Sequence, residues 1–205
     1  MRKQLTFIFI SLLGLSTALA DSGDRGKTSF EVDTEASKVH WTGKKVTGEH
    51  TGHLKIQEGV VHVDGNKVIE ASLSMDMNSI ECTDLSGEWK DKLIGHLKSD
   101  DFFSVEKYPN AMFKIKSVKN SGSEQVVVGD LTIKGITNEV TFPANVAVEG
   151  ETLTASGTAS IDRTLYDIKF RSAKFFSDLG DTMISDKFEI KFELKAKLND
   201  KTVME

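Results

Sequence analysis

The sequence contains few of the residues that cross-link a chain or interrupt its regular structure. Cys82 is its one cysteine, so no disulfide forms within the chain and stability must come from a hydrophobic core. The only prolines among 205 residues are Pro109 and Pro143. The 26 Lys and Arg residues are outnumbered by 31 Asp and Glu, which gives a formal net charge of −5. The lack of a basic excess argues against nucleic-acid binding and against electrostatic attraction to anionic membranes.

The usual catalytic and cofactor motifs are also missing. The sequence contains no nucleophile elbow, no zinc-ligand set and no dinucleotide-binding fingerprint. Segment 129–135 (GDLTIKG) lacks the Lys-Ser/Thr ending of a phosphate loop, and it favours a strand that ends in a turn. These absences make an enzyme less expected without eliminating one, and we expect no cofactor.

No apolar run beyond the N-terminus resembles a transmembrane segment, and we expect no stable membrane insertion of the mature chain. The first twenty residues combine a basic start at Arg2 and Lys3, an apolar run over 5–15, and small residues at Ala18 and Ala20. This pattern predicts a signal peptide cleaved after Ala20 and a mature protein that is periplasmic or secreted. A retained anchor is the alternative, but the run is short of the ~20 residues that span a bilayer. The expected divisions are a signal peptide (1–20), a flexible leader (21–28), one barrel domain (29–199) and a C-terminal tail (200–205).

Alternation of apolar and polar residues dominates the rest of the chain. It is clearest over 187–198 (KFEIKFELKAKL), where Phe188 and every second residue after it are apolar while Lys187 and every second residue after it are charged. A period of two predicts a long strand with one buried and one solvated face. Similar segments are expected at 39–44, 52–57, 59–63, 68–77, 111–118, 125–134, 139–148 and 152–161. A meander of about eight strands must pair as a sandwich or close on itself, and closure also removes exposed edges.

One helix is expected at about 85–98. Leu85, Trp89, Leu93 and Leu97 recur at a spacing of four with charged residues between them, and Asp84 or Ser86 is a candidate N-cap. A second short helical turn is expected around 177–181. The connection that follows the longer helix is unusually apolar, because segment 96–115 (HLKSDDFFSVEKYPNAMFKI) contains an adjacent Phe pair and a Tyr-Pro step. We expect it to fold inward and close an apolar space, as functional loops often do.

The histidines give no clear metal site. His50 and His53 are three residues apart, so on a strand they lie on opposite faces, and His62 alternates with apolar neighbours and is expected to face solvent. His96 stands at the end of the predicted helix. It is interpreted either as a structural residue in the last turn or as a polar group at the mouth of a cavity.

Two other residues have alternative interpretations. Arg163 follows a long alternating segment. It is either a surface or turn residue, or a guanidinium that faces a cavity entrance and suits a phosphate or quinone oxygen. Cys82 is read as a small, half-buried residue at a strand end rather than as a reactive thiol. The chain also has 12 Phe against 2 Tyr and 2 Trp, and a Phe-rich interior suits either a filled core or a tunnel for an alkyl chain.

Several motifs in order resemble the YceI-like family, over about residues 30–198. They are FEVD at 30–33, SKVHWTG at 37–43, HTG at 50–52, NSI at 78–80, HLKS at 96–99, DFF at 101–103, YP at 108–109, GDLTIKGIT at 129–137 and DR at 162–163. One departure is Tyr166-Asp167-Ile168, where many members have an aromatic-Gly-Ile step, so the backbone and pocket are expected to differ there.

The resemblance implies an all-β, extended, antiparallel, lipocalin-like barrel with one short helix at one end. It also implies that a polyisoprenoid or similar amphiphilic lipid, such as an isoprenoid quinone or a fatty-acid-like chain, lies in the lumen for transport, storage or sequestration. We expect the lumen lining to include Phe102, Phe103, Phe113 and Phe142, and the lipid head group to contact His96 and Arg163. No metal is expected, and a homodimer is possible. The alternatives are an enzyme acting on a lipid or quinone, and a ligand-free structural or stress-related barrel.

Overall fold

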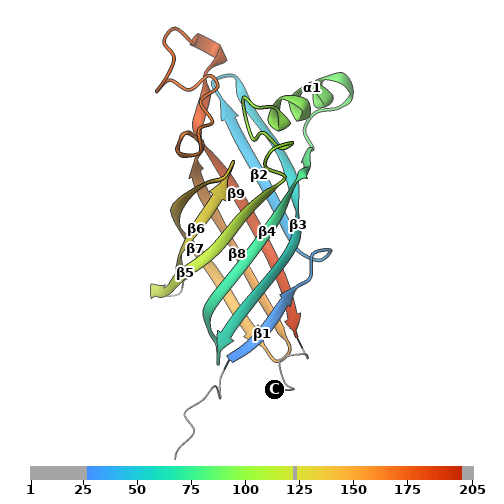
Figure 1. Ribbon diagram of the computed structural model, residues 1–205, viewed down its shortest axis with the longest axis vertical. Helices are drawn as coiled ribbons and strands as arrows, with labels where there is room; N and C mark the ends of the chain where they lie inside the picture. The colour runs from blue at the N-terminus through green and yellow to red at the C-terminus, as the bar shows by residue number, and fades with distance from the viewer. Residues whose placement is uncertain (1–26, 122–123, 200–205) are drawn as a thin grey trace, which may run out of the picture.

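The computed structural model describes residues 27–121 and 124–199 (Figure 1). The predicted signal peptide and the tail at 200–205 lie outside these residues. The strands are β1 (Lys27–Val32), β2 (Lys38–Lys45), β3 (Gly48–Asp64), β4 (Lys67–Cys82), β5 (Asn110–Ser121), β6 (Glu124–Ile133), β7 (Ile136–Glu149), β8 (Thr152–Asp162) and β9 (Ile184–Leu198). The helical elements are α1 (Gly87–Lys98) and the 3-10 turns η1 (Arg163–Tyr166) and η2 (Gly180–Thr182). Since β1 begins at Lys27, the predicted leader at 21–28 is two residues too long.

The strands close into an antiparallel barrel, as the sequence predicts. Neighbours run in the order β3-β2-β9-β8-β7-β6-β5-β4, and β4 pairs again with β3. Strand β1 also pairs with β3 and β9, so it occupies the same position in the wall as β2. Phe30 of β1 stands between Val61 and Leu198, whereas Trp41 of β2 stands between Gly52 and Ile190. Nine strands therefore fill eight positions around the ring.

Alternation determines which face of each strand is buried. On β9, the apolar residues from Phe188 to Leu198 face the interior or are half-buried, while the Lys and Glu residues between them are exposed. The interior contains an upper cluster that includes Phe113 and Tyr166 and a lower cluster that includes Phe30 and Leu153. This burial of one face per strand supplies the core that a chain without disulfides requires.

Strand β3 differs from the prediction. The segments expected at 52–57 and 59–63 form one continuous strand, because Gly59 is not a turn residue. A Cβ atom on Gly59 would lie 2.5 Å from the Leu73 side chain and 2.7 Å from that of Val32. The glycine therefore allows close packing within the wall rather than a break in it.

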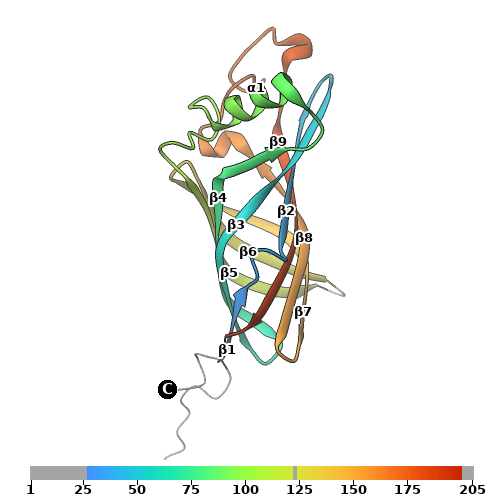
Figure 2. The ribbon, with the colours of Figure 1, turned by 90° about the vertical axis from the view of Figure 1, so that its right-hand side faces the viewer.

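Helix α1 and two loops cover one end of the barrel (Figure 2). The helix ends at Lys98, as expected, but begins at Gly87, and Ser86 at its N-cap position makes no side-chain capping bond. Leu97 is its buried residue. The second turn is η2, three residues beyond the start of the predicted 177–181 segment. Segment 163–183 rises at the same end as α1 (Figures 1 and 2). Among the described helices, none is long and apolar enough to cross a membrane.

Candidate functional site

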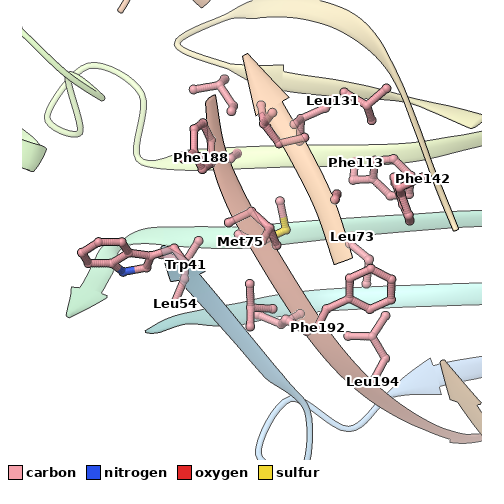
Figure 3. Close-up of a pocket in the computed structure, with 18 of the residues that line it drawn as sticks. Trp41, Leu54, Leu73, Met75, Phe113, Leu131, Phe142, Phe188, Phe192 and Leu194 are labelled. Carbon is pink, nitrogen blue, oxygen red and sulfur yellow. The ribbon is translucent and has the colours of Figure 1, made fainter. Parts of the chain in front are cut away.

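The barrel encloses an apolar cavity of about 230 Å³ (Figure 3). Its walls come from both interior clusters, so it extends along the barrel axis. The side chains that line it are almost all aliphatic or aromatic; those with charged or hydroxyl groups are Arg163, Ser185 and Lys187. All three belong to η1 or to the start of β9, at the end covered by α1. The cavity is thus apolar throughout, and Arg163, Ser185 and Lys187 adjoin it at one end without giving it a polar surface.

The four phenylalanines predicted to line the lumen all border this cavity. Phe113 on β5, Phe142 on β7 and Phe192 on β9 form a row of rings across the barrel, with successive centroids 5.6 Å apart. Phe102 and Phe103 reach the cavity from the loop that follows α1. Alternation places the first group inside the barrel, whereas the second group depends on the fold of a loop.

The loop at 99–109 is held by its own backbone. The amide of Phe103 donates to the Leu97 carbonyl, that of Val105 to the Lys98 carbonyl, and that of Ser104 to the Ser99 carbonyl. These bonds turn the chain back on the end of α1 and bury Phe102 and Val105. The expectation that this apolar connection folds inward is confirmed, and the loop forms a lid over the upper end of the cavity.

His96 is part of an aromatic cluster beneath this lid. Its ring centroid lies 5.0 Å from that of Phe102 and 4.4 Å from that of Phe170, with both pairs close to perpendicular. Its backbone carbonyl accepts hydrogen bonds from the backbone N–H and the hydroxyl of Ser99. The ring itself does not line the cavity. His96 joins α1 to the 163–183 segment by ring packing.

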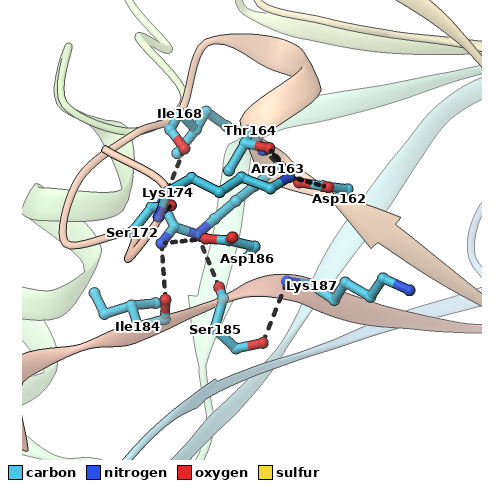
Figure 4. A network of polar contacts seen from close by, with 10 residues as sticks. All are labelled: Asp162, Arg163, Thr164, Ile168, Ser172, Lys174, Ile184, Ser185, Asp186 and Lys187. Atoms are coloured by element: carbon cyan, nitrogen blue, oxygen red, sulfur yellow. Dashed lines mark hydrogen bonds and ion pairs between the residues drawn. The ribbon is translucent and has the colours of Figure 1, made fainter. Parts of the chain in front are cut away.

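Arg163 is buried and fastens the same segment to the barrel (Figure 4). Its Nε donates to the Ser185 carbonyl at 2.9 Å, its Nη1 to the Ile168 carbonyl at 2.8 Å, and its Nη2 to the Ile184 carbonyl at 3.0 Å. Burial lowers the pKa of Arg163, and the charges of Asp186 and Asp162 oppose that shift. Arg163 also adjoins the cavity, at the end covered by α1.

A second polar group secures the start of η1. Asp162 accepts hydrogen bonds from the backbone and hydroxyl of Thr164, at 2.9 and 2.6 Å, and from Lys174 Nζ at 2.9 Å (Figure 4). Burial would raise the pKa of Asp162, but these hydrogen bonds outweigh it and lower that pKa. Asp162 thus ties Thr164 to Lys174, while Arg163 ties Ile168 to the start of β9.

Tyr166 is a residue that the sequence does not single out as polar and buried. It is 0% exposed, and its hydroxyl finds no hydrogen-bond partner among the described residues. Burial, followed by the charge of Asp162, raises the pKa of Tyr166 to about 12. Asp167 follows it with a φ of 58°. This is the left-handed region that glycine adopts easily, and here an aspartate adopts it.

A cluster at the top of β3 and β4 was also missed. Asp84 accepts from the backbone N–H of Thr51 at 2.8 Å and from Cys82 Sγ at 3.3 Å, and it shares a 2.8 Å hydrogen bond with His50 Nδ1. Burial would raise the pKa of Asp84, but these bonds lower it to about 2. Burial and Asp84 raise the pKa of the Cys82 thiol. In residues 27–121 and 124–199, no three His, Cys, Asp or Glu side chains form a metal-binding group.

Related sequences cover most of the chain. The family model described as the YceI-like domain matches residues 30–196. A UPF0312 protein of Pseudomonas putida strain F1 is 34% identical over 148 residues, which are 68% of this chain and 72% of that protein. A UPF0312 protein of Staphylococcus aureus strain USA300 is 39% identical over 111 residues, which are 51% of this chain and 60% of the relative.

Solved structures share the fold. BcnA of Burkholderia cenocepacia is 28% identical, with a TM-score of 0.64 over 81% of this chain and 99% of that one. A polyisoprenoid-binding domain from Saccharophagus degradans, described as implicated in plant cell wall breakdown, is 18% identical, with a TM-score of 0.61 over 84% and 99%. At that identity the second match is evidence of fold alone. From the family match, the barrel and the motifs that carry the resemblance, we conclude that the chain belongs to the YceI-like family.

Proposed function

We propose that this protein binds a polyisoprenoid or similar amphiphilic lipid in its barrel and carries, stores or sequesters it outside the cytoplasm. The observation that supports this most is the apolar cavity inside the barrel, which Arg163 adjoins at one end. The membership of the YceI-like family and the fold shared with a polyisoprenoid-binding domain favour binding over catalysis.

The size of the cavity supports an occupant. A buried void costs about 24 cal/mol per Å³ of stability, so about 230 Å³ left empty would cost on the order of 5 kcal/mol. Burying ~10 carbons of a lipid chain at about 0.8 kcal/mol each supplies on the order of 8 kcal/mol before ordering costs.

The head group of the lipid is proposed to lie at the end with Arg163. This residue donates three of its five N–H groups to backbone carbonyls, and it adjoins the lumen. A phosphate, carboxylate or quinone oxygen is the matching group. For His96, contact with the head group requires Phe102 or Phe170 to move aside, since both rings pack against it.

Export is part of the proposal, because the predicted signal peptide lies outside the described residues. The measurement is N-terminal sequencing of the protein from its host, with a mature start at Asp21 expected. The possible homodimer also stays a prediction, to be checked by the mass of the native protein in solution.

The test of lipid binding replaces a small side chain in the cavity wall by a large one, so that the side chain fills the space a lipid would occupy. Ala159 is buried and lines the lumen, while Ser160, its neighbour on β8, faces solvent. We expect Ala159→Phe to lose binding of geranylgeraniol and of the dye N-phenyl-1-naphthylamine, and Ser160→Phe to keep both. Ala155→Phe, at a half-buried lining position, serves as a second filling variant if Ala159→Phe folds poorly by circular dichroism. Equal binding by folded filling variants and the control would contradict the proposal.

A further inference from the structure

The exposed aromatic and large aliphatic side chains gather at the end of the barrel that holds the lid. Trp89 of α1 is 72% exposed, Leu165 of η1 is 52% exposed, and Phe175 and Phe176 are 47% and 51% exposed. Figures 1 and 2 place their elements at the same end of the molecule. We call these four residues the docking surface. Val46, 53% exposed, stands beside it, since its amide donates to the Met183 carbonyl.

The opposite end of the barrel has a different character. The turn between β3 and β4 is Asp-Gly-Asn-Lys over 64–67, and the turn between β7 and β8 includes Glu149 and Glu151. Among the described residues, the large apolar side chain exposed at this end is Ile69, at 37%. The concentration of exposed rings at one end is therefore not a general property of the surface, and such patches mark sites of interaction.

Two lysines beside the docking surface each contact one of its rings and pair with a carboxylate. Lys92 Nζ lies 5.1 Å from the centroid of the Trp89 ring and 3.5 Å from Glu88. Lys169 Nζ lies 5.3 Å from the Phe175 ring and forms an ion pair with Asp167. The surface thus presents rings beside closely spaced charges of both signs, with little net charge.

This chemistry matches the headgroup region of a zwitterionic bilayer. Rings with one apolar body and a polar or charged neighbour favour that region, where lysine stems cover apolar surface and keep their charge in water. A zwitterionic headgroup carries a phosphate and an ammonium group side by side, which complement the Lys and carboxylate pairs respectively. The ammonium group also suits an aromatic ring.

The position of the docking surface on the barrel also suits lipid exchange. It lies at the end where the lid covers the cavity and where Arg163 adjoins it. We propose that the docking surface seats the protein transiently on a zwitterionic lipid bilayer, so that a lipid enters or leaves by the lid end. This inference rests on the proposed function, because it names the surface from which the barrel exchanges its ligand.

The experiment measures co-sedimentation of the full mature chain with phosphatidylcholine vesicles. We expect binding that changes little between 50 mM and 500 mM NaCl, because rings rather than net charge drive it. The double variant Phe175→Ser with Phe176→Ser should bind at least about 10-fold more weakly, because two large apolar side chains no longer move from water into the bilayer. The matched control is Ile69→Ser with Met112→Ser, which removes exposed apolar side chains from outside the docking surface and should bind as the wild type does.

Tryptophan fluorescence gives a second reading. Trp41 is buried and Trp89 is exposed, so vesicles should shift the emission of the wild type to shorter wavelength and leave that of Trp89→Phe unchanged. The inference is overturned if the wild type does not bind vesicles. It is also overturned if binding requires phosphatidylglycerol and disappears at high salt, or if the Phe175 and Phe176 variant binds fully. Self-association that depends on these rings, without vesicle binding, would overturn it in favour of a second copy of the chain.

Failure here is separable from failure of the proposed function. Phe175 and Phe176 do not line the cavity, so their variant should bind N-phenyl-1-naphthylamine as the wild type does. Normal dye binding without vesicle binding refutes the docking surface alone. Loss of dye binding in the wild type refutes the lipid-binding function itself.

Discussion

The guanidinium of Arg163 lies 5.9 Å from the centroid of the Phe102 ring. The two residues come from different loops, one that follows β8 and one that follows α1. Their contact joins the 163–183 segment to the lid at the upper end of the cavity. Interactions between a cation and a desolvated ring of this kind contribute about 2 kcal/mol. The closure of the barrel is thus built from two loops that hold each other.

Phe102→Ala should destabilise the fold strongly. The ring is buried and packs against His96, Phe103 and Phe170, so its loss leaves a cavity and costs about 3–5 kcal/mol. Urea unfolding monitored by circular dichroism measures this. Phe175→Ala is the control at a half-exposed ring and should cost less than about 1 kcal/mol. A cost for Phe102→Ala as small as that of the control would mean that the lid does not close the core.

Replacement of Arg163 by lysine should not preserve stability. Lysine cannot reproduce three hydrogen bonds in different directions, so at least two of the three carbonyls would lose their partner. We expect Arg163→Lys to cost about 3 kcal/mol or more. Lys174→Ala removes a half-exposed ion pair with Asp162 and should cost within about 1 kcal/mol. Thermal melts of the two variants compare them directly, and similar melting temperatures would show that Arg163 does not fasten the segment.

Asp84 should give the fold a characteristic dependence on pH. Its folded pKa of about 2 lies below the unfolded value of 3.8. The carboxylate therefore stabilises the fold fully above the unfolded pKa, and this contribution is lost as pH falls from about 4 through 2. Asp84→Asn should cost up to about 2 kcal/mol at pH 6 and progressively less towards pH 2. The measurement is the free energy of unfolding in urea across this range.

The control for Asp84 is Asp64→Asn, at an exposed turn between β3 and β4. It should change stability by less than about 0.5 kcal/mol at both ends of the pH range. A loss for Asp84→Asn that stays constant with pH would indicate that the carboxylate acts by shape rather than by charge.

Two glycines should respond in opposite directions to alanine. A Cβ atom on Gly52 would overlap the Glu81 carbonyl oxygen and lie 2.7 Å from the Trp41 ring, and Trp41 Nε1 donates to that same carbonyl at 3.1 Å. Gly52→Ala should therefore destabilise the fold by at least about 2 kcal/mol. Gly95 in α1 has open space around it, so Gly95→Ala should stabilise by up to about 1 kcal/mol through helix propensity. Denaturation midpoints of both variants test the pair, and a neutral Gly52→Ala would refute the close packing of β3 on β4.

The barrel was predictable from sequence because period-two alternation is a local signal. Phe113 and Phe142 lie on the apolar face of their strands, and the structure places both at the cavity. Their contact with a ligand stays a prediction. The polar contacts of Arg163 were not predictable, because its partners are loop carbonyls whose positions depend on the closed fold.

Trp89 is a residue whose burial the helical periodicity predicts wrongly. It shares a row with Leu93 and Leu97, and that spacing predicts a buried residue. In the structure Leu97 is buried while Trp89 is exposed. Because Trp89 is exposed, contrary to the helical periodicity, its ring forms part of the docking surface.

The central claim is that the barrel holds a lipid. Native mass spectrometry of the protein purified from its own host tests it most directly, with lipid extraction to identify what is released. The expected result is a complex heavier than the mature chain by the mass of one polyisoprenoid or similar amphiphile, lost on denaturation and absent from Ala159→Phe. A wild-type protein that carries no lipid and takes up no geranylgeraniol when it is supplied would contradict the account.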